Sequence, residues 1–230
     1  MSIAAVPAAP QIWPEMAPIG IALVIAFVVL SLTLHEAAHA WVADQRGDPT
    51  ARELGRVTLN PLPHIDLFMT ILVPLILYMM NLPIFGGAKP VPVNYHRLKS
   101  PLRDMTLVAL AGPFTNLFLA AVFLVAWKVA VHVGGYERNM LLPQVLSASS
   151  LVNIILAVFN LFPIPPLDGS RVMAWLLPSS LRETYVSLER FGLLIVLVVI
   201  YVLGDYFMPI LWRAILDTWG AVDFLTGGVW

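Results

Sequence analysis

Long runs of apolar residues divide the chain and give the first indication of its structure. The runs cover residues 17–43, 67–82, 104–132, 145–162 and 188–204, with a weaker one at 206–217. All except 67–82 and 206–217 reach the roughly 17–25 residues that a helix needs to cross a bilayer. The polar connections are too short to form a separate soluble domain of about 50 residues. The pattern therefore predicts an all-α polytopic membrane protein with a single domain over residues 1–230.

The composition supports a membrane protein and limits its chemistry. Hydrophobic residues make up 59% of the chain and charged residues 12%, with a mean hydropathy of +0.83. The 13 Lys and Arg residues balance 14 Asp and Glu residues, and no basic block indicates a nucleic-acid partner. The chain has no Cys, which excludes disulfides, thiolate ligands and a cysteine nucleophile. A protein-bound metal must therefore rely on His and carboxylate side chains.

The residues with the most informative chemistry are His35, Glu36 and His39, near the end of the first apolar run. In an α-helix the two His residues lie about one turn apart, so both imidazoles can hold one metal ion. Glu36 lies beside them, where it can take a proton from a metal-activated water and pass it to a leaving amine. The spacing predicts a zinc hydrolase site. A merely interfacial position of the His residues is the alternative, although ionisable groups within a bilayer usually mark function.

A catalytic zinc site usually has three protein ligands and one open position. Asp168 is the candidate for the third ligand, because it follows the apolar run 145–162 in a Pro-rich segment that breaks regular helix. The alternative is that Asp168 only caps a short helix over residues 169–177.

Three motifs together resemble the site-2 protease family of intramembrane zinc metalloproteases, peptidase family M50. They are His35-Glu36-x-x-His39, Ala111-Gly112-Pro113-x-x-Asn116 and Asn160-x-x-Pro163-x-x-Pro166-Leu167-Asp168-Gly169. The resemblance is to a minimal form without PDZ or CBS modules. It implies hydrolysis of peptide bonds within or near transmembrane segments, with one Zn²⁺ bound by His35, His39 and Asp168, and Glu36 as general base and acid. It also implies that Asn160 places the substrate or stabilises the oxyanion.

The number of membrane crossings is an independent constraint on the metal site. The first helix and Asp168 can share an ion only if residues 67–82 do not cross the bilayer. Without that crossing, the basic residues between 46 and 103 all lie on one face, as the positive-inside rule favours. We therefore predict a re-entrant hairpin at 67–82 and a metal site toward the cytoplasmic side of a bacterial cytoplasmic membrane.

Residues 85–94 alternate like an irregular, short extended strand. Such backbone is tolerated at membrane depth where it lines a cavity, so Val91 and Val93 are candidates for pairing with a substrate helix opened into a strand. Asn116 and His64 are candidate residues lining the site. The alternatives are a hydrogen bond between helices for Asn116 and a backbone or solvent contact for His64.

The predicted architecture is a three-helix catalytic core within residues 17–178, with a peripheral C-terminal span and tail over 179–230. The expected partners are the lipid bilayer and a membrane protein with a transmembrane helix, and the oligomeric state stays open. Two alternative functions remain. A metal or proton transporter is disfavoured because the chain has no internal repeat, and a non-proteolytic zinc-binding membrane protein is disfavoured by the intact Glu36.

Overall fold

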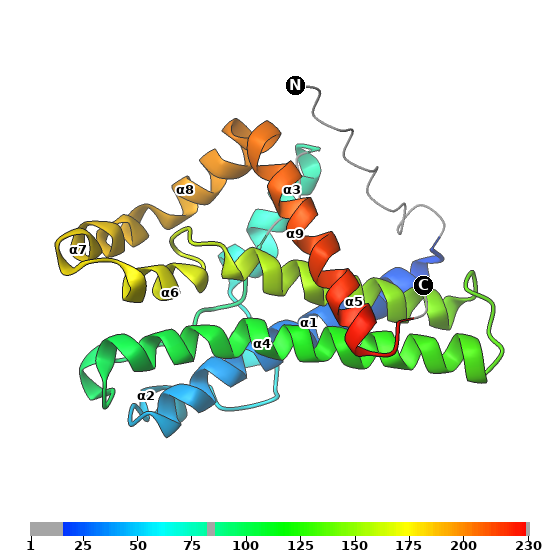
Figure 1. Ribbon diagram of the computed structural model, residues 1–230, viewed down its shortest axis with the longest axis horizontal. Helices are drawn as coiled ribbons and strands as arrows, with labels where there is room; N and C mark the ends of the chain where they lie inside the picture. Colours follow the sequence, from blue (N-terminus) through cyan, green and yellow to red (C-terminus); the bar gives the residue numbers. More distant parts are fainter. Residues whose placement is uncertain (1–15, 82–85, 229–230) are drawn as a thin grey trace.

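The computed structural model describes residues 16–81 and 86–228, and three long helices form its centre (Figure 1). They are α1 (Pro18–Gln45), α4 (Pro101–Lys128, continued by the π-helical turn Val129–Val133) and α5 (Leu141–Leu161). The three helices pack against one another, and the last turns of α1 and α5 lie with the first turn of α4 at one end of the bundle. The short helix α2 (Thr50–Glu53) follows there, and we call this the α2 end.

Four helical stretches are long and apolar enough to cross a membrane: Pro18–Gln45, Pro101–Val133, Leu141–Leu161 and Ser179–Val202. The prediction of an all-α polytopic membrane protein is confirmed, since the described residues form helices and no strand. Pro101 lies in the first turn of α4, where its missing N–H would be unpaired in any case. The helix therefore begins at Pro101, three residues before the start of the apolar run at 104.

The apolar segment after α2 folds back on itself, as the sequence predicts. It consists of a π-helical stretch (Leu67–Leu72) and α3 (Val73–Met79), which together are too short to cross a bilayer. The chain then returns to its starting point, because Gly87 N–H donates to Met69 O at 3.1 Å and Thr70 Oγ1 donates to Gly87 O at 2.7 Å. The last residue of the predicted hairpin segment 67–82 and the first residue of the predicted extended segment 85–94 lie outside the described residues. The hairpin leaves the ends of α1 and α5 on one side of the bundle.

Residues 86–94 run as irregular backbone and do not form the short strand that the alternating pattern suggested. Two prolines in this segment, Pro90 and Pro92, lack the N–H that a strand ladder needs, and the described residues offer no partner strand. Side chains hold the backbone instead. Asp48, which is fully buried, accepts Asn94 N–H at 2.6 Å, and Arg56 donates to Lys89 O at 2.5 Å.

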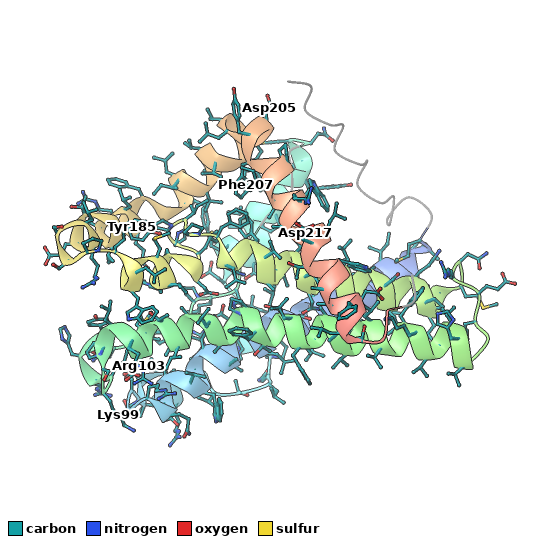
Figure 2. The ribbon with its side chains drawn as sticks, viewed as in Figure 1. Lys99, Arg103, Tyr185, Asp205, Phe207 and Asp217 are labelled. Atoms are coloured by element: carbon teal, nitrogen blue, oxygen red, sulfur yellow. The ribbon has the colours of Figure 1, made fainter. Side chains whose placement is uncertain are left out.

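The C-terminal part of the chain packs against α4 and α5 through its first and last helices. It contains α6 (Gly169–Leu176), α7 (Ser179–Ser187), α8 (Gly192–Leu197) and α9 (Gly204–Leu225), with helical turns at Leu188–Phe191 and Val198–Val202. Figure 1 shows α8 and α9 meeting at a bend, with α9 crossing over α5. Asp205 lies at this bend (Figure 2). The fourth candidate span runs over Ser179–Val202, so it begins before the predicted start at residue 188.

The main core lies where α4, α5 and α9 meet. Its buried members are Ala120, Leu124, Trp127, Leu151, Ile154, Val158, Phe207, Leu211, Ile215 and Val222. The weak apolar run at 206–217 is thus part of α9 and contributes to the core. Within a bilayer such contacts stabilise through close packing, and fully buried Ala120 allows the close approach that this packing needs. Lys128 at the end of α4 also pairs with Asp223 at 2.7 Å, which fixes the end of α9.

Basic residues gather at the α2 end of the bundle. Lys99 and Arg103 lie there, beside the start of α4, and Tyr185 of α7 lies at the same end (Figure 2). The Tyr185 hydroxyl donates to Pro163 O at 2.9 Å, so α7 is tied to the Pro-rich segment that follows α5. The segment that contains Asp168 is therefore held at the α2 end.

Candidate metal centre

Two side chains of α1 and one from the Pro-rich segment after α5 meet inside the bundle. His35 Nε2 lies 3.0 Å from His39 Nε2, and Asp168 Oδ2 lies 3.2 Å and 3.4 Å from these two nitrogens. Both His residues are buried, and the three groups each direct one ligand atom to a common point. The structure thus brings together the three residues that the sequence suggests as metal ligands.

The outer nitrogen of each His ring is held by a neighbouring helix. His35 Nδ1 lies 2.5 Å from Asn116 Oδ1, and His39 Nδ1 lies 2.7 Å from the Val108 carbonyl oxygen. A carbonyl oxygen can only accept, so each Nδ1 acts as the donor and the Nε2 lone pair is left for a metal. This is the usual arrangement of metal-ligating His residues.

Asp168 occupies the N-cap position of α6, but its side chain forms no capping hydrogen bond. The capping alternative is therefore wrong, and the carboxylate is directed toward the His rings. Gly169 makes this placement possible, because a Cβ atom there would lie 2.6 Å from the Phe162 carbonyl oxygen. Burial raises the pKa of Asp168, but the adjacent His39 and His35 lower it more, so that the pKa lies well below the usual range. A low pKa favours the ionised carboxylate, which is the form that binds a metal ion.

The donor set fits zinc. Two imidazole nitrogens and one carboxylate oxygen are typical of catalytic zinc sites. Asp168 Oδ2 is buried and has no hydrogen-bond partner in the described part of the chain, which is costly for a carboxylate unless a cation satisfies it. Gly112 of α4 faces both rings, and a Cβ atom there would lie 2.5 Å from His35 Nε2. The missing side chain leaves room for the imidazoles and an ion.

A cavity of about 170 Å³ opens beside these groups. Its lining consists of Glu36, His39, Pro90, Val91, Val93, Met105, Val108, Ala109, Pro166, Asp168, Arg171 and Glu189. Glu36 therefore shares a cavity with two of the candidate ligands, as expected for a general base. One Glu36 carboxylate oxygen accepts Val91 N–H at 3.1 Å. Both predicted edge residues, Val91 and Val93, line this cavity.

Two charged residues that line the cavity are not among the site residues predicted from the sequence. Arg171 of α6 and Glu189 form an ion pair, which connects the segment after Asp168 to the fourth apolar stretch. Thr106 of α4 also lies 3.4 Å from the Arg171 carbonyl oxygen. The pair closes one side of the cavity, but it is partly exposed to solvent, so its contribution to stability is small.

The remaining predicted residues differ in their positions. Asn116 contacts His35 directly. Asn160 donates to Leu156 O in its own helix at 2.9 Å and lies outside the lining of the cavity. His64 is buried, with Nε2 lying 3.2 Å from Thr58 O, and it also lies outside that lining. The structure therefore does not bring Asn160 or His64 to the metal centre, and the role implied for Asn160 stays a prediction.

Comparisons with known proteins agree with this chemistry. The model of "Peptidase family M50" matches residues 128–203. "Putative zinc metalloprotease YwhC" of Bacillus subtilis is 41% identical over 192 residues, which cover 80% of this chain and 82% of that protein. "Putative zinc metalloprotease Rip2" of Mycolicibacterium smegmatis is 32% identical over 183 residues, which cover 77% of this chain and 66% of that longer relative. No solved structure matches the chain.

Proposed function

The chain belongs to peptidase family M50, and we propose that it is an intramembrane zinc metalloprotease that cleaves membrane proteins within or near their transmembrane segments. The observation that carries the proposal is the position of the metal centre. His35, His39 and Asp168 lie close enough to hold one metal ion, and Glu36 shares a cavity with His39 and Asp168. His35, Glu36 and His39 all belong to an apolar helix that is long enough to cross a membrane. Polar groups in such a position usually serve a function.

The residues around the cavity have separate roles in the proposed reaction. Zn²⁺ bound there would supply Lewis acidity to the scissile carbonyl and to the attacking water. His35, His39 and Asp168 would hold the ion. Glu36 takes the proton of the attacking water and passes it to the leaving amine, since its carboxylate lies in the same cavity as the ligands.

An apolar groove next to the site supports a transmembrane helix as the substrate. A cavity of about 490 Å³ lies between α1, α5, the hairpin and the bend of α8 and α9. On α1 its lining includes Ile25, Val29 and Leu32, whose spacing continues to Glu36 on the same helix face. A substrate helix in this groove would therefore extend along α1 toward Glu36. The groove is lined mainly by apolar side chains, which suits a membrane segment.

The backbone beside Glu36 supports cleavage of an extended substrate. Val91 N–H points at Glu36. If residues 91–93 are drawn into an extended conformation by a substrate, the N–H of Val93 would lie along the same edge. A substrate strand that pairs with this edge would lie within the cavity that Glu36 lines.

We expect Val93→Pro to lower the cleavage rate roughly 2- to 10-fold and to leave the zinc content unchanged. The substitution removes one N–H from the proposed edge and leaves the bond between Val91 and Glu36 intact, and a hydrogen bond contributes roughly 0.5–1.5 kcal/mol. Cleavage of a single-span substrate in vesicles measures the effect, and Val93→Ala, which keeps the N–H, is the control. Equal rates for the Pro and Ala variants would contradict the edge.

Removal of the metal tests the proposed function as a whole. We expect a membrane-permeant chelator to abolish cleavage of a single-span substrate in proteoliposomes, and added Zn²⁺ to restore it. Mass spectrometry of the products should place the new termini within or next to the substrate span. Cleavage that continues after zinc has been removed, or that occurs only far outside the span, would refute the proposal.

A further inference from the structure

A chain of buried hydrogen bonds connects His35 to the two neighbouring helices. His35 Nδ1 lies 2.5 Å from Asn116 Oδ1 of α4, and Asn116 Nδ2 donates to Asn153 Oδ1 of α5 at 2.9 Å. Asn153 Nδ2 in turn donates to the Ser149 carbonyl at 2.9 Å and to Ser31 Oγ at 3.0 Å. Asn116 and Asn153 are at most 1% exposed, so water does not compete for these bonds.

The direction of every bond in this chain follows from its far end. The Ser149 carbonyl can only accept, so the amide nitrogen of Asn153 must face it and the amide oxygen must face α4. That oxygen requires a donor, so Asn116 presents its nitrogen to Asn153 and its oxygen to His35. An amide oxygen likewise only accepts. His35 must then carry a proton on Nδ1, so in the neutral ring Nε2 presents a lone pair.

Ser31 does not set this direction. Its hydroxyl can both donate and accept, so it is compatible with either orientation of the Asn153 amide. The second ligand, His39, has a simpler arrangement, because the Val108 carbonyl accepts directly from its Nδ1. A backbone carbonyl thus orients each of the two rings. For His39 the contact is direct, whereas for His35 the side-chain amides of Asn116 and Asn153 lie between the ring and the carbonyl.

We propose that Asn153 is a positioning residue, which fixes the Nδ1-protonated tautomer of His35 through Asn116 and so keeps Nε2 free for the metal. The inference rests on the proposed role of His35 as a zinc ligand. In the other tautomer, the Nδ1 lone pair would face the Asn116 oxygen, and a compensating rotation of both amides would place the Asn153 oxygen against the Ser149 carbonyl. Buried groups left in this way without partners are costly.

The experiment compares Asn153→Leu with two control variants in the full-length protein. Ser150→Ala removes another buried bond between α5 and α4, from Ser150 Oγ to Ala120 O, which has no connection to His35. Ser31→Ala removes the bond that does not set the direction. Competition with a chelator gives the Zn²⁺ affinity of each variant. Nitrogen NMR of His-labelled, metal-free protein at alkaline pH gives the tautomer of His35.

We expect Asn153→Leu to weaken zinc binding about 10-fold, within the range found for partners of metal ligands, and to give a mixture of His35 tautomers. The two control variants should stay within about 3-fold of the wild type and keep the Nδ1-protonated form. Wild-type affinity together with an unchanged tautomer in Asn153→Leu would overturn the inference. Asn116→Leu removes the same link from α4 and serves if Asn153→Leu does not fold.

A rescue variant separates this role from a purely structural one. Asn116→Asp places a carboxylate beside His35 Nδ1. Both oxygens of a carboxylate accept hydrogen bonds, so it accepts from Nδ1 whether or not Asn153 is present. Adding Asn116→Asp to Asn153→Leu should therefore restore the Nδ1-protonated tautomer, although the bonds to α5 are still missing. A double variant that keeps mixed tautomers would also overturn the inference. The tautomer is measured without metal, so this test of Asn153 does not depend on zinc binding. A wild type that binds no zinc would refute the proposed function and would leave the result for the tautomer valid.

Discussion

A Glu36→Gln variant is expected to lose 10²- to 10⁴-fold in cleavage rate and to keep its zinc. Glutamine has nearly the same shape as glutamate and can still accept the Val91 N–H through its amide oxygen, so the cavity should be preserved. It cannot take a proton from water, and general acid and base catalysis contributes roughly 10²- to 10⁴-fold. His35 and His39 are unchanged, so metal binding should persist.

Initial rates in proteoliposomes and zinc content per chain together measure this effect. Glu53→Gln is a matched control, because Glu53 is exposed on α2 at the same end of the bundle. In cells, membrane-protein fragments with a single span should accumulate in the Glu36→Gln strain. Near-wild-type cleavage by Glu36→Gln would contradict the role of Glu36. Flux of zinc or protons that survives the substitution would favour the transporter alternative.

Gly112→Ala is expected to remove most of the bound zinc, and the activity with it. A Cβ atom at this position would lie 2.5 Å from His35 Nε2 and would also overlap His39, so α1 and α4 would have to separate. Overpacking of this kind costs roughly 1–3 kcal/mol in a packed interior, and here it falls directly on the ligand atoms. Zinc content, zinc affinity and thermal stability of the purified variant measure the effect.

Gly220→Ala is the control for this variant. Gly220 lies in α9, and a Cβ atom there meets no other atom within 4 Å. The substitution should leave zinc binding unchanged and stabilise the helix slightly, since alanine is favoured over glycine in helices. If Gly112→Ala bound zinc like the wild type, the rings could not lie as close to α4 as the structure has them.

The helices and the three candidate ligands could be predicted from the sequence because each has a local signal. Apolar runs locate the spans, and the spacing of His35 and His39 places both rings on one helix face. The position of Asp168 followed from its motif together with the number of crossings. The hairpin at 67–82 could be expected for the same reason, since only a segment that turns back lets Asp168 reach the His residues.

The contacts behind the ligands could not be predicted in this way. Asn116 meets Asn153 only because α4 and α5 pack in one register, and an apolar run does not specify the register. An Asn within the run 145–162 was the available signal, since polar side chains in spans usually find a partner. A motif also fixes which residue is present but not where its side chain points. Asn160 shows this, because its amide bonds to its own helix.

The hydrogen bond between Val91 and Glu36 sets a condition that an incoming substrate must meet. While the bond exists, one oxygen of the carboxylate is engaged by the protein's own backbone. Releasing Glu36 leaves Val91 N–H without an acceptor unless the substrate brings one. The interior of a helical segment offers no free acceptor, because its carbonyls are already bonded within the helix. Under the proposed function, a membrane segment that has already lost helical turns is thus the one that frees the general base, and an intact helix that drifts into the groove leaves it engaged.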